Sequence, residues 1–225
     1  MPRPHHVTMK PGRPPNEDAG FSLIELIVAM GVFMIFIALV MTTTVTLARS
    51  ATRSQLTAEA SNASLTVFGS FDRQARYADA INFPGASLTG ARYVEFRTPG
   101  NSSASGVTTC TQWRFIPNLQ RLESRSWQDI PGTTLPAFTT KLTNVIDDGG
   151  ADYPFKLTPA SLTGSLMQQL TVTLHSGNAS LNAGAAMSTT FVARNSSVKS
   201  PSNVDADNNK ASDTPVCATD AGYRP

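Results

Sequence analysis

The chain has 225 residues, a formal net charge of +2 and 15% charged residues, which suits one ordinary domain with an attached anchor. So small a charge excludes nucleic acid as a bulk electrostatic partner. Two cysteines, Cys110 and Cys217, stand far apart and form no Cys-x-x-Cys pair, which disfavours structural zinc and dithiol redox motifs.

Residues 1–20 are polar and proline-rich, so they cannot build a core. We interpret them as a leader that is excluded from the fold, with Met9 as an alternative start. His5 and His6 lie in this leader and are interpreted as incidental rather than as metal ligands. Loss of the leader removes three basic and two acidic residues, which leaves a net charge of +1.

Residues 21–41 form an apolar run that contains two polar residues, Ser22 and Glu25. Roughly 20 apolar residues cross the hydrocarbon core as a helix, so the run predicts one membrane span. A carboxylate inside such a run costs about 2.5–3.5 kcal/mol at mid-membrane, and Glu25 therefore needs a partner. The basic residues of the leader favour a cytoplasmic N-terminus, although Arg49 and Arg53 weaken this signal.

Gly20, followed by Phe-Ser-Leu-Ile-Glu and a long apolar helix, resembles the N-terminus of type IV prepilins and the related pseudopilins. The resemblance implies that prepilin peptidase cuts between Gly20 and Phe21 and methylates the new amine of Phe21. It also implies that Glu25 pairs with the Phe21 amine of a neighbouring subunit, two opposite charges in a low dielectric. The chain departs from the pattern in two places, since residues 16–19 lack a basic residue and no proline follows before residue 84.

The resemblance implies four kinds of partner: other pilins or pseudopilins, prepilin peptidase, an assembly platform in the membrane, and membrane lipid before assembly. The expected location is the cytoplasmic membrane and then a filament outside it. Two alternatives stay open. Small residues at 46–48 allow a signal-peptidase cut after Ala48, which would release a soluble exported domain, although the apolar run exceeds a usual signal core and contains Glu25. The second alternative is a membrane-anchored protein that binds an extracellular ligand.

Residues 42–83 predict an amphipathic continuation of the helix, which Pro84-Gly85 ends. The β-branched residues of Thr42–Thr46 are its weak point. Asp72 and Arg76 are expected to form an i,i+4 pair. The apolar residues that recur at steps of three and four on the expected inner face are Leu56, Ala60, Ala63, Val67, Phe71, Ala78 and Ile81.

Residues 84–195 predict an antiparallel sheet whose strands are separated by Gly, Ser, Asn and Pro. Pro117-Asn118 indicates a hairpin, and Asp147–Gly150 indicates a turn. The predicted fold class is α+β, a long N-terminal helix packed on an antiparallel head, which is also the fold that the resemblance implies. The expected strands are residues 91–98, 108–116, 119–127, 137–146, 153–157, 170–175 and 189–194.

Residues 196–225 are expected to be a polar loop or a solvated tail. Residues 205–209 resemble the start of a calcium loop, but Lys210 replaces its glycine and Val216 its glutamate, so no metal is expected. An exported domain can oxidise its cysteines, which predicts a Cys110–Cys217 disulfide that tethers the tail to the sheet. Two free thiols are the alternative.

Outside the leader the chain has one histidine, His175, interpreted as a strand-end surface residue, so the sequence offers no catalytic triad. Neither an enzyme nor a cofactor is expected. Residues 70–78, SFDRQARYA, resemble the Asp-x-x-x-Arg-x-Ala segment of minor pseudopilin J and similar minor pilins. The chain is therefore interpreted as a minor pilin or J-type pseudopilin of a type II secretion, type IV pilus or competence system.

Overall fold

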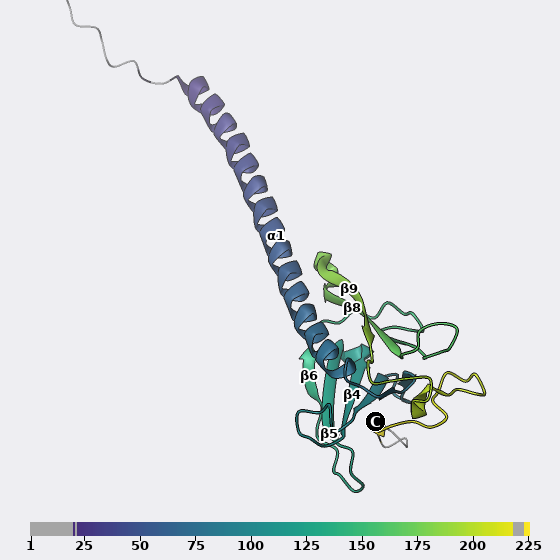
Figure 1. The fold of residues 1–225 in the computed structure, drawn as a ribbon. Coiled ribbons are helices and arrows are strands. Elements are labelled where there is room, and N and C mark those ends of the chain that lie inside the picture. The colour runs from purple at the N-terminus through teal and green to yellow at the C-terminus, as the bar shows by residue number, and fades with distance from the viewer. Residues whose placement is uncertain (1–19, 21, 218–222) are drawn as a thin grey trace, which may run out of the picture. The chain divides into compact units, whose positions relative to one another are not determined.

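The computed structural model describes residues 20, 22–217 and 223–225 (Figure 1). The predicted leader lies outside these residues except for Gly20. The chain divides into two compact units, the first ending at Arg49 and the second beginning at Ser50. This boundary falls inside helix α1, Leu23–Ala75, so the two parts of α1 are described separately.

The first part of α1 stays helical through its β-branched stretch. The predicted weak point, Thr42–Thr46, is regular helix in the structure. Its threonine hydroxyls donate to main-chain carbonyls three or four residues earlier, at 2.8–3.1 Å. This internal bonding satisfies the hydroxyls without breaking the helical bonds, which explains how the helix tolerates the stretch.

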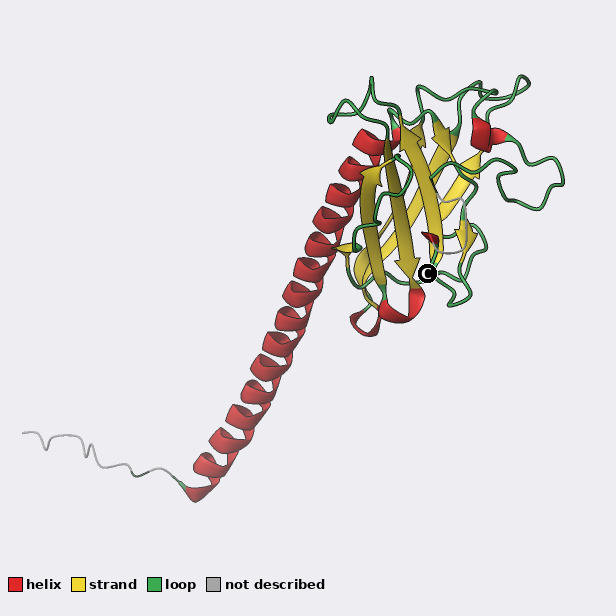
Figure 2. Cartoon of the chain, turned by 90° about the horizontal axis from the view of Figure 1, so that it is seen from below, coloured by secondary structure: helices red, strands yellow, loops and turns green. Residues whose placement is uncertain are grey.

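The second part of α1 packs its inner face against strands (Figure 2). The prediction is confirmed for Val67 and Phe71, which are buried, whereas Leu56, Ala60 and Ala63 are half-buried. The fully buried ring of Phe71 stacks on one indole with a centroid distance of 4.0 Å and lies within 6.1 Å of two further rings. These three neighbours are Trp113, Phe155 and Phe191.

The helix ends at Ala75, earlier than the sequence predicts. Ala80–Ile81 forms strand β1 instead. The side chain of Gln168 acts as a strand partner here, since its Oε1 accepts from the Ile81 N–H at 2.8 Å and its Nε2 donates to the Ile81 carbonyl at 3.1 Å. Ile81 and Ala78 are buried all the same, so apolar spacing alone could not separate helix from strand at this point.

In the described part of the chain the head contains two antiparallel sheets rather than the single sheet predicted. The first sheet has the order β1, β3 (Arg92–Thr98), β4 (Thr109–Ile116), β5 (Arg121–Gln128) and β6 (Thr139–Leu142), with β2 (Gly85–Ala86) also paired to β3. The second sheet has the order β7 (Phe155–Thr158), β8 (Gln169–Asn178) and β9 (Ala183–Val192). An isolated antiparallel bridge joins Val145 to Ser176 of β8, the middle strand of the second sheet.

The expected hairpin between β4 and β5 is present, with a 3-10 turn at Pro117–Leu119 and Gln120 in the left-handed region at φ 50°. A second such turn, Ala179–Leu181, joins β8 to β9 and starts β9 six residues before the prediction. The main core lies between α1 and both sheets. The fold is therefore α+β and pilin-like, as predicted: α1 is long, its first part is apolar, and its second part packs against antiparallel sheets.

The segment from Ser196 to Cys217 is a loop, as expected, and residues 206–211 are exposed, whereas both ends of the segment include buried residues. Ser202, in the 3-10 turn Pro201–Asn203, is fully buried, and Val216 and Cys217 are also buried. The predicted Cys110–Cys217 disulfide is present, with a Cα–Cα distance of 5.6 Å. Polar composition did not indicate the buried part, because a buried serine can be satisfied by a partner: Ser202 donates to the Ile81 carbonyl at 2.7 Å.

Candidate functional site

The N-terminal motif lies where α1 begins. Gly20 is exposed and precedes the helix, whereas Phe21 lies outside the described residues. The carbonyl of Ser22 accepts from the Leu26 N–H at 3.1 Å, which starts the helical bonding. Glu25 falls in the first turn, where the helix dipole favours a negative charge. The predicted cut would therefore fall in chain that precedes the regular helix.

The apolar side chains of α1 up to Leu47 are exposed. Leu23 is 78% exposed and Leu47 is 72% exposed. Among the described residues, α1 is long and apolar enough to cross a membrane, although a signal sequence can share these properties. None of this apolar part of α1 is buried within the described chain, so its surface needs lipid or other helices to cover it.

Glu25 is exposed and has no ion-pair partner among the residues that the structure describes. In apolar surroundings a carboxylate is stabilised by an opposite charge close by. Its charge is therefore available to a cation that comes from outside the described chain.

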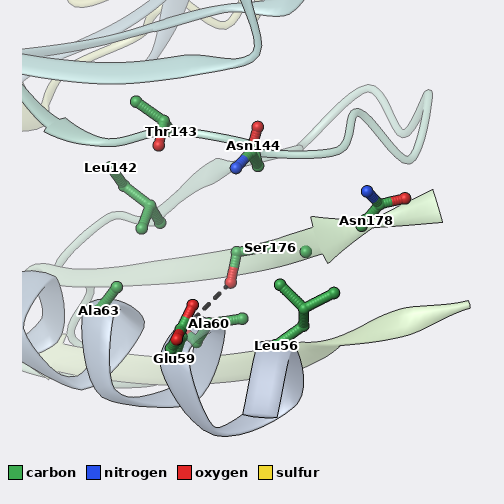
Figure 3. A pocket seen from close by; sticks show the side chains of 10 residues that line it. Leu56, Glu59, Ala60, Ala63, Leu142, Thr143, Asn144, Ser176 and Asn178 are labelled. Atoms are coloured by element: carbon green, nitrogen blue, oxygen red, sulfur yellow. Dashed lines mark hydrogen bonds between the residues drawn. The ribbon is translucent and has the colours of Figure 1, made fainter. Parts of the chain in front are cut away.

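The head has a cavity of about 240 Å³ between α1 and the ends of β6 and β8 (Figure 3). Ser176 lines this cavity, and its hydroxyl forms hydrogen bonds with the Ser64 hydroxyl at 2.8 Å and with the Ala60 carbonyl at 3.3 Å. Ligand pockets usually enclose roughly 300–1,000 Å³, so this cavity is small for one. The lining residues are Leu56, Glu59, Ala60, Ala63, Leu142, Thr143, Asn144, Ser176, Gly177 and Asn178.

His175 lies inside strand β8 and is half-buried. The prediction that it is a surface residue at the end of a strand is therefore wrong. Its ring centroid is 5.5 Å from that of Tyr153. The Tyr153 hydroxyl donates to the Ile146 carbonyl at 2.7 Å and accepts from the main-chain N–H of His175 at 3.2 Å. Burial raises the pKa of Tyr153 to about 12, which keeps this phenol protonated and fits a structural role.

The acidic segment that resembles a calcium loop does bring carboxylates together. Asp205, Asp207 and Asp213 have oxygens within 4.8 Å of one another. Main-chain N–H groups within the loop donate to Asp205 and Asp213 at 3.0–3.1 Å, which explains the local turn. Val216, at the position of the calcium-loop glutamate, is buried, so the departure seen in the sequence remains in the structure.

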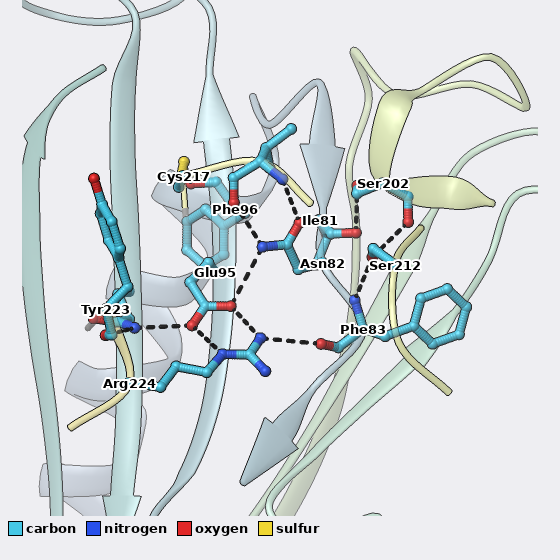
Figure 4. Close-up of polar contacts among 12 residues, drawn as sticks. Ile81, Asn82, Phe83, Glu95, Phe96, Ser202, Ser212, Cys217, Tyr223 and Arg224 are labelled. Atoms are coloured by element: carbon cyan, nitrogen blue, oxygen red, sulfur yellow. Dashed lines mark hydrogen bonds and ion pairs between the residues drawn. The ribbon is translucent and has the colours of Figure 1, made fainter. Parts of the chain in front are cut away.

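A polar network in the head joins residues that the sequence pattern did not group (Figure 4). Glu95 on β3 is fully buried and forms an ion pair with Arg224 at 2.6 Å. The available signal was an acidic residue between two apolar ones in the middle of an expected strand, Val94-Glu95-Phe96. This alternation is typical of a solvent-facing side chain, so it indicated neither the burial of Glu95 nor its partner Arg224, which lies 129 residues further along the chain.

Comparison with known families matches residues 16–41 to the Prokaryotic N-terminal methylation motif. No curated protein and no solved structure matches the chain. The matched residues include the expected cut, Glu25 and the apolar run, and the motif implies processing by prepilin peptidase and assembly with pilins. Proteins of the pilin-like family are generally structural rather than enzymatic. The motif places this chain among type IV prepilin-like proteins.

Proposed function

We propose that the chain is a minor pilin or a J-type pseudopilin, a structural subunit of a type IV pilus-like filament, a type II secretion system or a competence system. The observation that carries this proposal is the exposed apolar helix that starts at the methylation motif with Glu25 in its first turn. Such a helix has two stable environments, lipid before assembly and neighbouring subunit helices afterwards.

Assembly uses the charge that cleavage creates. The cut between Gly20 and Phe21 gives Phe21 a free amine, which is a cation at neutral pH. Glu25 of an incoming subunit pairs with the Phe21 amine of its neighbour when the two helices come together in an apolar surrounding. The exposed position of Glu25 supports this role because the carboxylate can be reached from outside its own chain.

The minor-subunit assignment is supported by the end of α1. Asp72 and Arg76 form the expected i,i+4 ion pair at 2.5 Å, in the segment that resembles the Asp-x-x-x-Arg-x-Ala pattern of J-type subunits. The second supporting feature is the absence of proline from residues 21–83, since filament-forming major pilins often have one near the end of the apolar run.

The test is the N-terminal mass of the protein purified from membranes. The expected species begins at N-methylated Phe21. Gly20→Val should block the cut because it places a branched side chain next to the bond. Ala48→Val is the matched control, since it alters the alternative signal-peptidase site and should leave the Phe21 start unchanged. A chain that begins at Arg49 would refute the proposal, and an uncut chain would indicate a plain membrane anchor.

A further inference from the structure

Three turns of the head each expose a leucine. Leu88 is fully exposed, Leu119 is 52% exposed and Leu181 is 44% exposed. Leu88 lies in the turn between β2 and β3, and the other two lie in the 3-10 turns that join β4 to β5 and β8 to β9. Turn tips usually carry polar or small residues, which suit both water and the turn geometry. A single exposed leucine is common on a protein surface, so the relative positions of the three decide what they indicate.

The strand register places the three leucine turns at one end of the head. A row of cross-strand partners runs through the strand ends nearest to the first two turns, and it consists of Arg92, Phe115, Leu122 and Leu142. Leu142 also lines the cavity that contains Leu56 of α1 and Asn178, the residue that caps the third turn (Figure 3). The leucine turns therefore share the end of the head at which Leu56 lies.

The chain enters the head at this same end, because the second unit begins at Ser50, shortly before Leu56. Residues 42–49 join the unit to the apolar run that ends at Met41. Even a fully extended chain of this length reaches only about 30 Å. In the proposed function the apolar run spans the bilayer, so the leucine turns stay near the bilayer surface whatever path the connecting residues take. A short tether of this kind raises the effective concentration of that surface at the turns.

The charges near this end add a small attraction to anionic lipid. Arg53, Arg121 and Lys141 are exposed and form no ion pair with a described residue. Glu59 and Asp148 are exposed carboxylates that likewise lie outside the ion pairs of the described chain, and they offset two of these charges. The remaining positive surplus attracts anionic headgroups only weakly. The leucines, rather than the charges, are therefore expected to supply most of the contact.

We propose that the three leucine turns form a surface that rests on the lipid bilayer before the subunit is assembled. Leu88, Leu119 and Leu181 enter the boundary between headgroups and acyl chains, where apolar side chains lose their contact with water and the turn main chain keeps polar partners. The inference rests on the proposed function, which places α1 across the bilayer, and it adds a second contact between the same subunit and lipid. Extraction into a filament then has to release the head as well as the helix.

The experiment measures lipid contact of the full chain in nanodiscs that hold one copy in phosphatidylcholine with phosphatidylglycerol. A fluorophore is attached to one added cysteine beside each leucine, with the native disulfide intact, and a nitroxide near the lipid headgroup quenches any label that reaches it. The labelled variants are Thr89→Cys, Asn118→Cys and Ser180→Cys. Each should lose fluorescence to the nitroxide lipid.

The matched control is Thr163→Cys, beside another exposed leucine. Leu162 is 82% exposed and lies in the loop between β7 and β8, at the opposite end of β8 from Asn178. A label on this loop should keep its fluorescence, because the connecting residues do not bring it to the bilayer.

Removal of the leucines separates their contact with lipid from mere proximity. Leu119→Ser together with Leu181→Ser should abolish most of the quenching at Ser180→Cys, since the turn then has no apolar side chain to insert. Leu162→Ser should leave that quenching unchanged. Quenching that persists after both leucines are removed would contradict the proposed contact.

Equal quenching at all four labelled sites, or none at the three leucine turns, would overturn the proposal. Contact that appears only when two copies share a nanodisc would also overturn it, because the turns would then bind another subunit. None of these results alters cleavage at Gly20, which is read from the N-terminal mass, so the proposed function keeps its own test.

Discussion

Phe71 is a residue of α1 that contacts both sheets, and its truncation is a sharp test of the fold. Its fully buried ring contacts Trp113 of the first sheet and Phe155 and Phe191 of the second. Phe71→Ala removes the buried ring and leaves a cavity where three aromatic contacts meet. Changes of this kind cost about 3–5 kcal/mol, and the stacked contact with Trp113 favours the upper half of this range.

The assay is urea unfolding of the full chain in detergent, followed by the fluorescence of its two tryptophans, Trp113 beside the cavity and Trp127 elsewhere in the first sheet. Leu65→Ala is the matched control on the same helix, because Leu65 is 54% exposed and its truncation should change the free energy of unfolding by about 0.5 kcal/mol or less. A loss below about 1 kcal/mol for Phe71→Ala, or equal losses for the two variants, would refute the packing described for α1.

Three further outcomes are expected. Glu25→Ala should leave membrane insertion intact, because it removes a desolvation cost, but should reduce recovery in filaments; normal recovery would contradict the charge pairing. Gln168→Ala leaves the buried Ile81 N–H without its acceptor and should cost about 1–3 kcal/mol in urea unfolding; a loss near zero would contradict the bonding at β1. Burial raises the pKa of Asp147, but the hydrogen bonds and charge of Arg92, with a bond from the Gly149 N–H, lower it overall. Asp147→Asn should therefore destabilise the head at pH 7 by about 1 kcal/mol or less, and the difference should vanish as the pH falls below the usual carboxyl range; a pH-independent difference would contradict this.

Local patterns in the sequence predicted much of the fold. The turn residues between β4 and β5 and the apolar spacing around Val67 and Phe71 each act over a few residues, so they can be recognised without knowledge of distant partners. The end of α1 could not be recognised in this way. Ile81 becomes a strand residue because Gln168, which lies 87 positions away in the sequence, bonds to its main chain.

The start of β9 was missed for a related reason. Residues 183–187, Ala-Gly-Ala-Ala-Met, have weak intrinsic strand preference, and their pairing with β8 places them in the sheet. At the candidate site, the motif around Gly20 was recognised because it is contiguous. The Glu95–Arg224 pair was not recognised, since composition indicated that the last thirty residues are polar but not that they cover a buried carboxylate.

The threonine hydroxyls between residues 42 and 46 affect how easily this part of α1 moves between water and lipid. Each one already has an acceptor within α1, so it does not need water to satisfy it. Transfer of a satisfied hydroxyl from water to hydrocarbon costs far less than transfer of a bare one. These hydroxyls therefore add little cost when this turn of helix moves from water into lipid or against another helix. In the filament subunit proposed above, these hydroxyls would add no steep polar barrier when the helix shifts along the membrane normal as it leaves the bilayer.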